Sequence, residues 1–377
     1  MRAIQADVPF RADLLIARRP ACAARRPLRY DRRAMVVHDV IVIGAGPAGL
    51  ATAIAAKKAG LSAVALEKGV LVNSLFHFPT HMVFFTTPEL LEIGGLPFVT
   101  PYEKPTRAEA LRYYRRVVDT WQLDVELDQE VTRVHPEVGP GGSRVLAVDT
   151  RSGRGVRRLR HGRTVVIATG AYDRPNLLGV AGETLPHVSH YYGEAHPHYR
   201  KQVVVVGGKN SAAEAALDLH RAGARVTLVH RRAHLGESIK YWVKPDIENR
   251  IAEGAIQSRF EARVVEIRPT SVVIERHGTS EELAADAVLL LTGYHSDTEL
   301  FERAGVAFDP ATCVPQINPD TLETSAEGVF LAGAVIAGRE GGKIFIENGR
   351  FHGEQVIGVI ARRLRDMKGA VPSLQTS

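Results

Sequence analysis

Two stretches of this sequence share one pattern, in which an apolar run is followed by a glycine-rich turn and a run compatible with a helix. The first turn is Gly44-Ala45-Gly46-Pro47-Ala48-Gly49, and the second is Gly207-Gly208-Lys209-Asn210-Ser211-Ala212. The helical runs end at Gly60 and Gly223, and a further apolar run follows each of them. A strand, a tight glycine turn, a helix and a second strand form a Rossmann unit, which binds a pyrophosphate at the helix N-terminus. The pattern therefore predicts two nucleotide-binding units in one chain.

The residue that follows the second apolar run has opposite chemistry in the two units. Glu67 and His230 each lie 23 positions after the first glycine of their turn, and Arg231 and Arg232 follow His230. A carboxylate at this place accepts hydrogen bonds from the adenosine ribose and repels a 2′-phosphate, whereas an arginine attracts one. The sequence therefore predicts an FAD site in the first unit and an NADPH site in the second.

Each of these motifs also has a purely structural explanation. Glycine turns between a strand and a helix occur for packing alone, and Ala212 stands where the second motif would have its third glycine. Residues 230–232 would also suit a basic strand end that faces solvent. The complete strand, turn, helix and strand context favours the two nucleotide sites.

Composition and charge limit the possible partners. The chain of 377 residues is 45% hydrophobic, which suits two globular domains. Its formal net charge of +6 comes entirely from residues 1–34, so the remainder gives no basis for a nucleic-acid surface. The 2 cysteines, Cys22 and Cys313, fit a reducing compartment, and no apolar run approaches the roughly 20 residues of a membrane span. We therefore expect a cytoplasmic protein that contacts neither membrane nor nucleic acid.

Residues 1–34 differ from the rest of the chain. They contain nine arginines and no apolar segment long enough for a signal peptide. Their composition predicts disorder, and we expect Met35, just before the first strand, to be the true start. An arginine-rich targeting or interaction tail is the alternative.

Three further apolar runs end in small residues, at 163–170, 288–293 and 328–333. Small residues at a strand end leave room for a flat cofactor or for a chain that crosses between domains. We therefore expect an α/β protein of two nested Rossmann-like domains, each a three-layer ββα sandwich. Residues 36–172 and 291–377 form the FAD domain, residues 173–290 form the NADPH domain inserted into it, and residues 145–156 and 264–275 form β excursions.

Several longer motifs point to a family: Val72-Asn73-Ser74, His77-Phe78-Pro79-Thr80-His81-Met82, Lys104-Pro105-Thr106-Arg107, Val188-Ser189-His190-Tyr191-Tyr192 and residues 345–353. The nested layout resembles that of low-molecular-weight thioredoxin reductases. Over residues 38–365 the motifs are similar to those of the bacillithiol disulfide reductase family. This resemblance implies an NADPH-dependent FAD enzyme that reduces the oxidised form of a low-molecular-weight thiol, with a homodimer as the family's usual state.

The chain departs from both families in its cysteines. Thioredoxin reductases have a Cys-x-x-Cys where this chain has residues 188–194, and a dithiol relay needs a thiolate to attack a disulfide. Bacillithiol disulfide reductases typically have a cysteine where this chain has Ala48. Cys313 is expected to be a small buried hydrophobe. The acceptor must therefore receive electrons from the flavin itself or provide its own thiol.

The candidate site residues follow from the motifs and from the resemblance. For the FAD site they are Gly44, Gly46, Pro47, Ala48, Gly49, Glu67, Lys68, Asn73, His81, Val131, Ala168, Thr169, Gly170, Gly333, Ala334, Lys343 and Ile344. For the NADPH site they are Gly207, Gly208, Asn210, Ser211, Ala212, His230, Arg231 and Arg232.

Some of these residues have particular expectations. By the family's pattern, Lys343 and Ile344 open the final helix near the flavin, and Ala334 replaces an aspartate that many flavoproteins have after Gly333. Asn73 or His81 either donates to the flavin or has a structural role. His77 and His81 flank Pro79, which argues against a helix and hence against a metal site. Tyr191, Tyr192 and His190 either stack on the nicotinamide, shield the flavin face or pack between the domains.

Three functions remain open. The leading one is an oxidoreductase that passes electrons from NADPH through FAD to a low-molecular-weight disulfide such as bacillithiol disulfide. A reductase of ferredoxin, flavodoxin or quinones on the same fold is the second. A flavin-bound redox sensor without turnover is the third, because cofactor motifs indicate binding and not catalysis.

Overall fold

The structure is a computed structural model that describes residues 35–339 and 342–369. The expectations for residues 1–34, a disordered tail or translated upstream sequence, lie outside the described residues.

The first sheet has seven strands in the order β3-β2-β1-β6-β5-β4, with β17 also paired to β6. Strands β1, β2, β3, β6 and β17 run parallel, and β4 and β5 add antiparallel pairs at one side. The bounds are β1 (Val37–Ile43), β2 (Ala63–Leu66), β3 (Val125–Glu126), β4 (Glu130–Val138), β5 (Arg144–Arg151), β6 (Arg157–Ile167) and β17 (Val329–Leu331). A strand from near the C-terminus thus completes the sheet that β1 begins.

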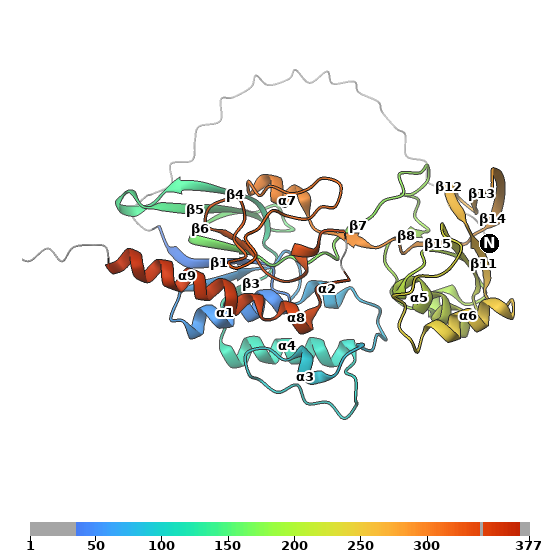
Figure 1. The fold of residues 1–377 in the computed structure, drawn as a ribbon, viewed down its shortest axis with the longest axis horizontal. Helices are drawn as coiled ribbons and strands as arrows, with labels where there is room; N and C mark the ends of the chain where they lie inside the picture. The colour runs from blue at the N-terminus through green and yellow to red at the C-terminus, as the bar shows by residue number, and fades with distance from the viewer. Residues whose placement is uncertain (1–34, 340–341, 370–377) are drawn as a thin grey trace, which may run out of the picture. The chain divides into compact units, whose positions relative to one another are not determined.

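Both faces of this sheet are covered. Val40 and Val42 of β1 pack toward the helices, whereas Ile41 and Ile43 pack toward β4, β5 and α7. This two-residue alternation, with every position apolar, is typical of a parallel strand buried on both faces. Helices α1 and α9 lie side by side on the helical face (Figure 1). The helices are α1 (Pro47–Lys58), α2 (Asn73–Phe76), α3 (Pro88–Leu91), α4 (Arg107–Trp121), α7 (Thr298–Arg303), α8 (Ile346–Gly349) and α9 (His352–Gly369).

The second sheet has five parallel strands in the order β11-β10-β9-β15-β8. Val203 and Val205 of β9 face α5 and α6, and Val204 and Val206 face a three-stranded antiparallel sheet, β12-β13-β14. The bounds are β8 (Val188–Ser189), β9 (Gln202–Val206), α5 (Asn210–Arg221), β10 (Arg225–His230), α6 (Lys244–Ala252), β11 (Gln257–Phe260), β12 (Ala262–Arg268), β13 (Ser271–Arg276), β14 (Thr279–Ala284) and β15 (Ala287–Leu290). This unit is therefore a helix layer, a parallel sheet and a β layer.

Two short strands connect the two units. β7 (Arg174–Pro175) pairs antiparallel with β16 (Tyr294–His295). Beside them Tyr172 and Tyr191 both pack against Tyr294, with ring centroids 4.5 Å and 5.5 Å from it. Burial raises the pKa of Tyr172 to about 12. The aromatic rings thus hold the outward and return segments together.

These sheets confirm the predicted α/β fold of two Rossmann-like units, while the exact domain boundaries stay a prediction. The excursion expected at 145–156 is β5 and the turn before β6, and the one expected at 264–275 lies in β12 and β13. Strand β4 was not expected. Within the described ranges no helix is long and apolar enough to cross a membrane.

Helix α4 offers a test of local stability. Thr106 is its N-cap, and the Thr106 side chain and Glu109 form a reciprocal capping box. We expect Thr106→Ala to lower the free energy of unfolding by about 1 kcal/mol, because amides of the first helical turn lose an acceptor. Urea unfolding would measure this change. Thr106→Ser, which keeps the hydroxyl, should unfold like the original chain, and equal losses in both variants would contradict the prediction.

Candidate nucleotide-binding sites

The first glycine turn joins β1 to α1 and requires its glycines. A Cβ atom at Gly44, where φ is +103°, would lie 2.7 Å from the Ala168 carbonyl oxygen, and one at Gly49 would lie 2.0 Å from the Gly44 oxygen. A Cβ at Gly46 would meet no atom within 4 Å, so this backbone is open to a ligand. In the described part of the chain no side chain caps the N-terminus of α1, which leaves its first amides available to a pyrophosphate.

Glu67 reaches back from the end of β2 to this turn. Its Oε2 accepts a hydrogen bond from the Ala45 amide at 2.9 Å, and Oε1 accepts one from the Gly69 amide at 3.1 Å. The side chain is almost fully buried. Burial raises the pKa of Glu67, and the two amide hydrogen bonds partly offset this. A carboxylate has about four acceptor positions, so two such bonds leave capacity for ribose hydroxyls.

His230 occupies the equivalent place in the second unit. A Cβ atom at Gly208 would lie 2.2–2.5 Å from three ring atoms of His230, so the imidazole lies directly against the turn. Ala45 and Gly208 are each the second residue of their turn. Glu67 and His230 therefore contact matching backbone positions in the two units. Burial and the charges of Arg231 and Arg232 lower the pKa of His230, so its ring is neutral at pH 7. Both arginines are exposed.

The second turn is also held by a loop that the sequence did not indicate. The Asn210 side chain donates to the Ser238 carbonyl at 3.1 Å and accepts from the Lys240 amide at 2.9 Å. The Gly236 amide donates to the Gly208 carbonyl at 2.7 Å. Asn210 therefore anchors this loop beside the turn. Ser211 is exposed at the start of α5, and Ala212 is buried against Gly207.

Burial raises the pKa of Glu214, on the first turns of α5, to about 7, and Lys240 acts in the opposite direction. Glu214 is partly buried. It is therefore a carboxyl group near the second turn whose pKa lies above the usual range because of burial. The motif alone did not single it out.

Six other candidates of the first unit lie after β2, in β4 and after β6. Lys68 pairs with Asp173 at 2.8 Å, and the Asn73 side chain accepts from the Val70 amide at 3.3 Å. Val131 lies in β4 and packs against the core. The residues just before β4 donate backbone hydrogen bonds to the carbonyls of Glu67 and Gly69. Ala168 bonds to Ile43, the Thr169 hydroxyl is buried without a protein partner in the described chain, and Gly170 has φ of +71°.

Gly333 lies where β17 meets the first turn. A Cβ atom there would be 2.6 Å from Cβ of Ala48. Ala334 lies in a short 3-10 helix, Gly333–Ala337, that follows β17. The expectation that Lys343 and Ile344 open the final helix is wrong, because the next helix, α8, begins at Ile346 and the final helix, α9, begins at His352. The Asn348 side chain accepts from the Phe345 amide at 2.8 Å and donates to the Lys343 carbonyl at 3.0 Å, which holds residues 343–345 outside the helix.

The segment that replaces the Cys-x-x-Cys is used for packing. Tyr192 is buried and its hydroxyl donates to Asp218 of α5. The Tyr191 hydroxyl donates to the carbonyls of Tyr172 and Asp173 at 3.3 Å and 3.2 Å. Cys313 is 3% exposed and free, consistent with its expected role as a small buried hydrophobe.

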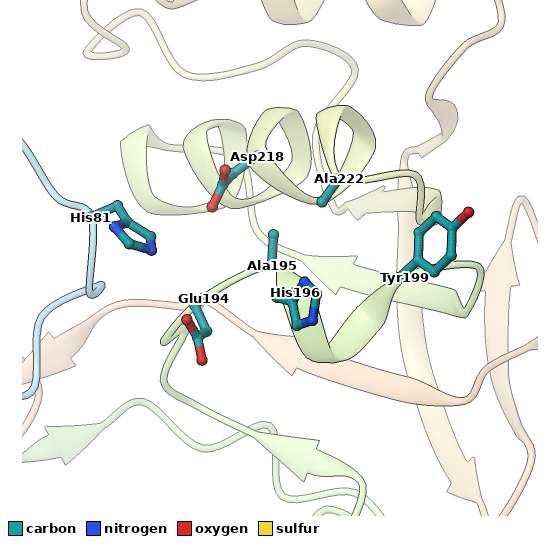
Figure 2. A pocket seen from close by; sticks show the side chains of 7 residues that line it. All are labelled: His81, Glu194, Ala195, His196, Tyr199, Asp218 and Ala222. Carbon is teal, nitrogen blue, oxygen red and sulfur yellow. The ribbon is translucent and has the colours of Figure 1, made fainter.

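A pocket of about 410 Å³ lies beside the same segment (Figure 2). Its lining residues are His81, Glu194, Ala195, His196, Tyr199, Asp218 and Ala222. Asp218 follows Asn210 by eight residues, or about 12 Å along α5, so the pocket is away from the nucleotide end of that helix. Its two carboxylates disfavour an anionic ligand. In the ranges 35–339 and 342–369, no group of three or more His, Cys, Asp or Glu residues could hold a metal ion.

Comparison with known proteins identifies the family. Residues 41–333 match the pyridine nucleotide-disulphide oxidoreductase family. The chain is 42% identical over 331 residues to bacilliredoxin reductase Bdr from Bacillus subtilis (strain 168), covering 87% of this chain and 99% of that protein. It is also similar to the structures of bacillithiol disulfide reductase Bdr (YpdA) from Bacillus cereus and Staphylococcus aureus. Their TM-scores are 0.84 and 0.81, at 40% and 37% identity, and each covers 87% of this chain and 100% or 99% of its own.

The fold and the two turns define a flavoprotein of the pyridine nucleotide-disulphide oxidoreductase class, whose members bind FAD and NAD(P)H. Within that class the chain belongs to the bacillithiol disulfide reductase (Bdr) family. The family, the enzyme class and the use of a flavin with a nicotinamide nucleotide, all expected from the sequence, are thereby confirmed. The individual site residues stay predictions.

Proposed function

We propose that this enzyme uses NADPH in preference to NADH, with FAD in the first unit and NADPH in the second. The main support is the position of Arg231 and Arg232, which directly follow the histidine that lies against the second turn. No ion-pair partner for either guanidinium occurs among the described residues, so both can bind a 2′-phosphate. Glu67 at the matching place of the first unit disfavours a 2′-phosphate there.

The chain's residues bind and orient the two cofactors. The amides that begin α1 and α5 hold the pyrophosphates, Glu67 binds a ribose, and the arginines bind the phosphate. When bound, the nicotinamide supplies a hydride to the flavin, and the flavin supplies two electrons to an acceptor.

The acceptor we propose is a low-molecular-weight disulfide such as bacillithiol disulfide. The names of the Bacillus cereus and Staphylococcus aureus relatives and the coverage of nearly their whole length support it. Ala48 and the buried Cys313 leave no well-placed thiol in the described residues, so we propose that electrons reach the disulfide from the flavin directly. We place the enzyme in the cytoplasm and expect a homodimer.

Anaerobic mixing with NADPH followed by an acceptor panel tests this function. We expect the absorbance of the oxidised flavin to bleach and bacillithiol disulfide to restore it faster than ferredoxin, flavodoxin, quinones or oxygen do. Purified bacilliredoxin belongs in the panel because the Bacillus subtilis relative is named for it. A flavin that stays oxidised would overturn the enzyme reading, and preferential reoxidation by ferredoxin or a quinone would overturn the acceptor.

A further inference from the structure

His352 is a residue of the first unit that the sequence motifs did not select for the site. It is the first residue of α9 and is half-buried. Its Nδ1 atom accepts a hydrogen bond from the Gly333 amide at 3.1 Å. Gly333 in turn lies against Ala48 of the first glycine turn. The imidazole is therefore one hydrogen bond away from the segment that packs on the proposed FAD site.

This hydrogen bond determines the protonation of the ring. An Nδ1 atom that accepts from an amide has no hydrogen of its own, so in the neutral ring the hydrogen is on Nε2. Protonation of Nδ1 would direct an N–H group at the Gly333 N–H group. Burial lowers the pKa of His352, which also favours the neutral ring. At pH 7 the side chain therefore presents one fixed donor, the Nε2–H group.

The surrounding packing fixes where His352 stands relative to α1. A Cβ atom at Gly353 would lie 2.7 Å from backbone atoms of Thr52, so the start of α9 is in close contact with α1. The Thr52 hydroxyl donates to the Ala48 carbonyl at 2.8 Å, which ties that contact to the first turn of α1. A Cβ atom at Gly349 would lie 3.2 Å from Cα of Gly333. The first turns of α1, the segment at Gly333 and the segment that ends at Gly349 thus meet near His352, and each contains or contacts predicted FAD residues.

The same region has a missing polar group. Ala334 follows Gly333, so the chain has a methyl group there and no carboxylate for a flavin hydroxyl. We propose that His352 is a flavin-positioning residue whose Nε2–H group donates a hydrogen bond to FAD in this part of the site. The inference rests on the proposed placement of FAD in the first unit, and it does not depend on the nicotinamide preference or on the acceptor.

Two substitutions separate the two nitrogen atoms. In His352→Asn the amide oxygen takes the place of Nδ1 and still accepts from Gly333, but the donor at the Nε2 position is lost. In His352→Gln the longer side chain returns a donor near the Nε2 position and gives up the acceptor for Gly333. A purely structural histidine is therefore replaced better by asparagine, and a cofactor donor better by glutamine.

The measurement is the Kd of FAD for flavin-stripped full-length protein, from quenching of flavin fluorescence, together with the absorbance spectrum and midpoint potential of the bound flavin. We expect His352→Asn to raise the Kd about tenfold and shift the potential while the Tm of the flavin-stripped protein stays unchanged. His352→Gln should lower the Tm and keep the Kd within about twofold of the original. His277→Asn, at an exposed turn between β13 and β14, is the matched control and should change neither the Kd nor the Tm.

An unchanged Kd and an unchanged spectrum in His352→Asn would overturn the proposal, and so would a Kd that rises equally in both variants. Failure of the proposed function would appear differently, in the original chain itself, as normal FAD binding without preference for NADPH or without disulfide turnover, whatever the Kd values of the two His352 variants.

Discussion

Replacing both Arg231 and Arg232 by alanine is expected to lower kcat/KM for NADPH about 100-fold and to leave kcat/KM for NADH within about twofold. Each charge-assisted hydrogen bond to a phosphate contributes about 1.5–3 kcal/mol, and the exposure of both side chains places the sum near the lower end. The 2′-phosphate is the group that distinguishes the two nucleotides, so an effect through this contact changes one KM only. Steady-state kinetics with both nucleotides measure it.

The matched control is Arg225→Ala, compared with each single arginine variant. Arg225 is exposed at the start of β10, whereas Arg231 follows its end, so the net charge changes equally at the far end of the same strand. We expect no change in nucleotide preference for Arg225→Ala. Equal losses with NADPH and NADH in the double variant would show that residues 231 and 232 do not meet a 2′-phosphate. Raising the ionic strength should weaken NADPH binding in the original chain more than in the double variant.

The site parts that the sequence predicted are those set by local geometry. A glycine turn, a helix and a strand of fixed lengths bring the chain back to the turn at the residue that lies 23 positions after the first glycine. This holds for both Glu67 and His230. The alternation of buried residues in β1 and β9 likewise depends only on the two-residue repeat of a strand. These features follow from the chain's immediate neighbourhood.

The parts that were missed depend on contacts between distant segments. Asn210 bonds to residues 28 and 30 positions later, and Gly333 bonds to His352 across 19 positions. No periodicity or turn motif encodes these pairs. The helix start predicted at residues 343 and 344 is wrong for a local reason, since the Asn348 side chain bonds to backbone groups of residues 343–345, and α8 begins only at Ile346. Side chains that bond to the backbone in this way shift helix ends by a few residues.

Introducing a thiol at residue 48 should change the reaction itself. Ala48 is half-buried in the first turn of α1, where the helix N-terminus stabilises a thiolate. A thiolate attacks a disulfide directly, which gives the acceptor a covalent route in place of direct transfer from the flavin. We therefore expect Ala48→Cys to raise kcat/KM for bacillithiol disulfide by at least about tenfold while the rate of flavin reduction by NADPH stays the same.

The control for this prediction is Ala48→Ser, which adds a group of similar shape that does not form a nucleophilic anion at neutral pH. Turnover is measured both by NADPH oxidation and by release of the free thiol. Gain in the cysteine variant alone would show that the rest of the site already accepts the disulfide and lacks only the nucleophile. The result that contradicts the prediction is equal turnover in all three chains with intact flavin. Because Cβ of Ala48 lies against Gly333, a loss of flavin from both variants would instead identify this contact as too tight for any larger side chain.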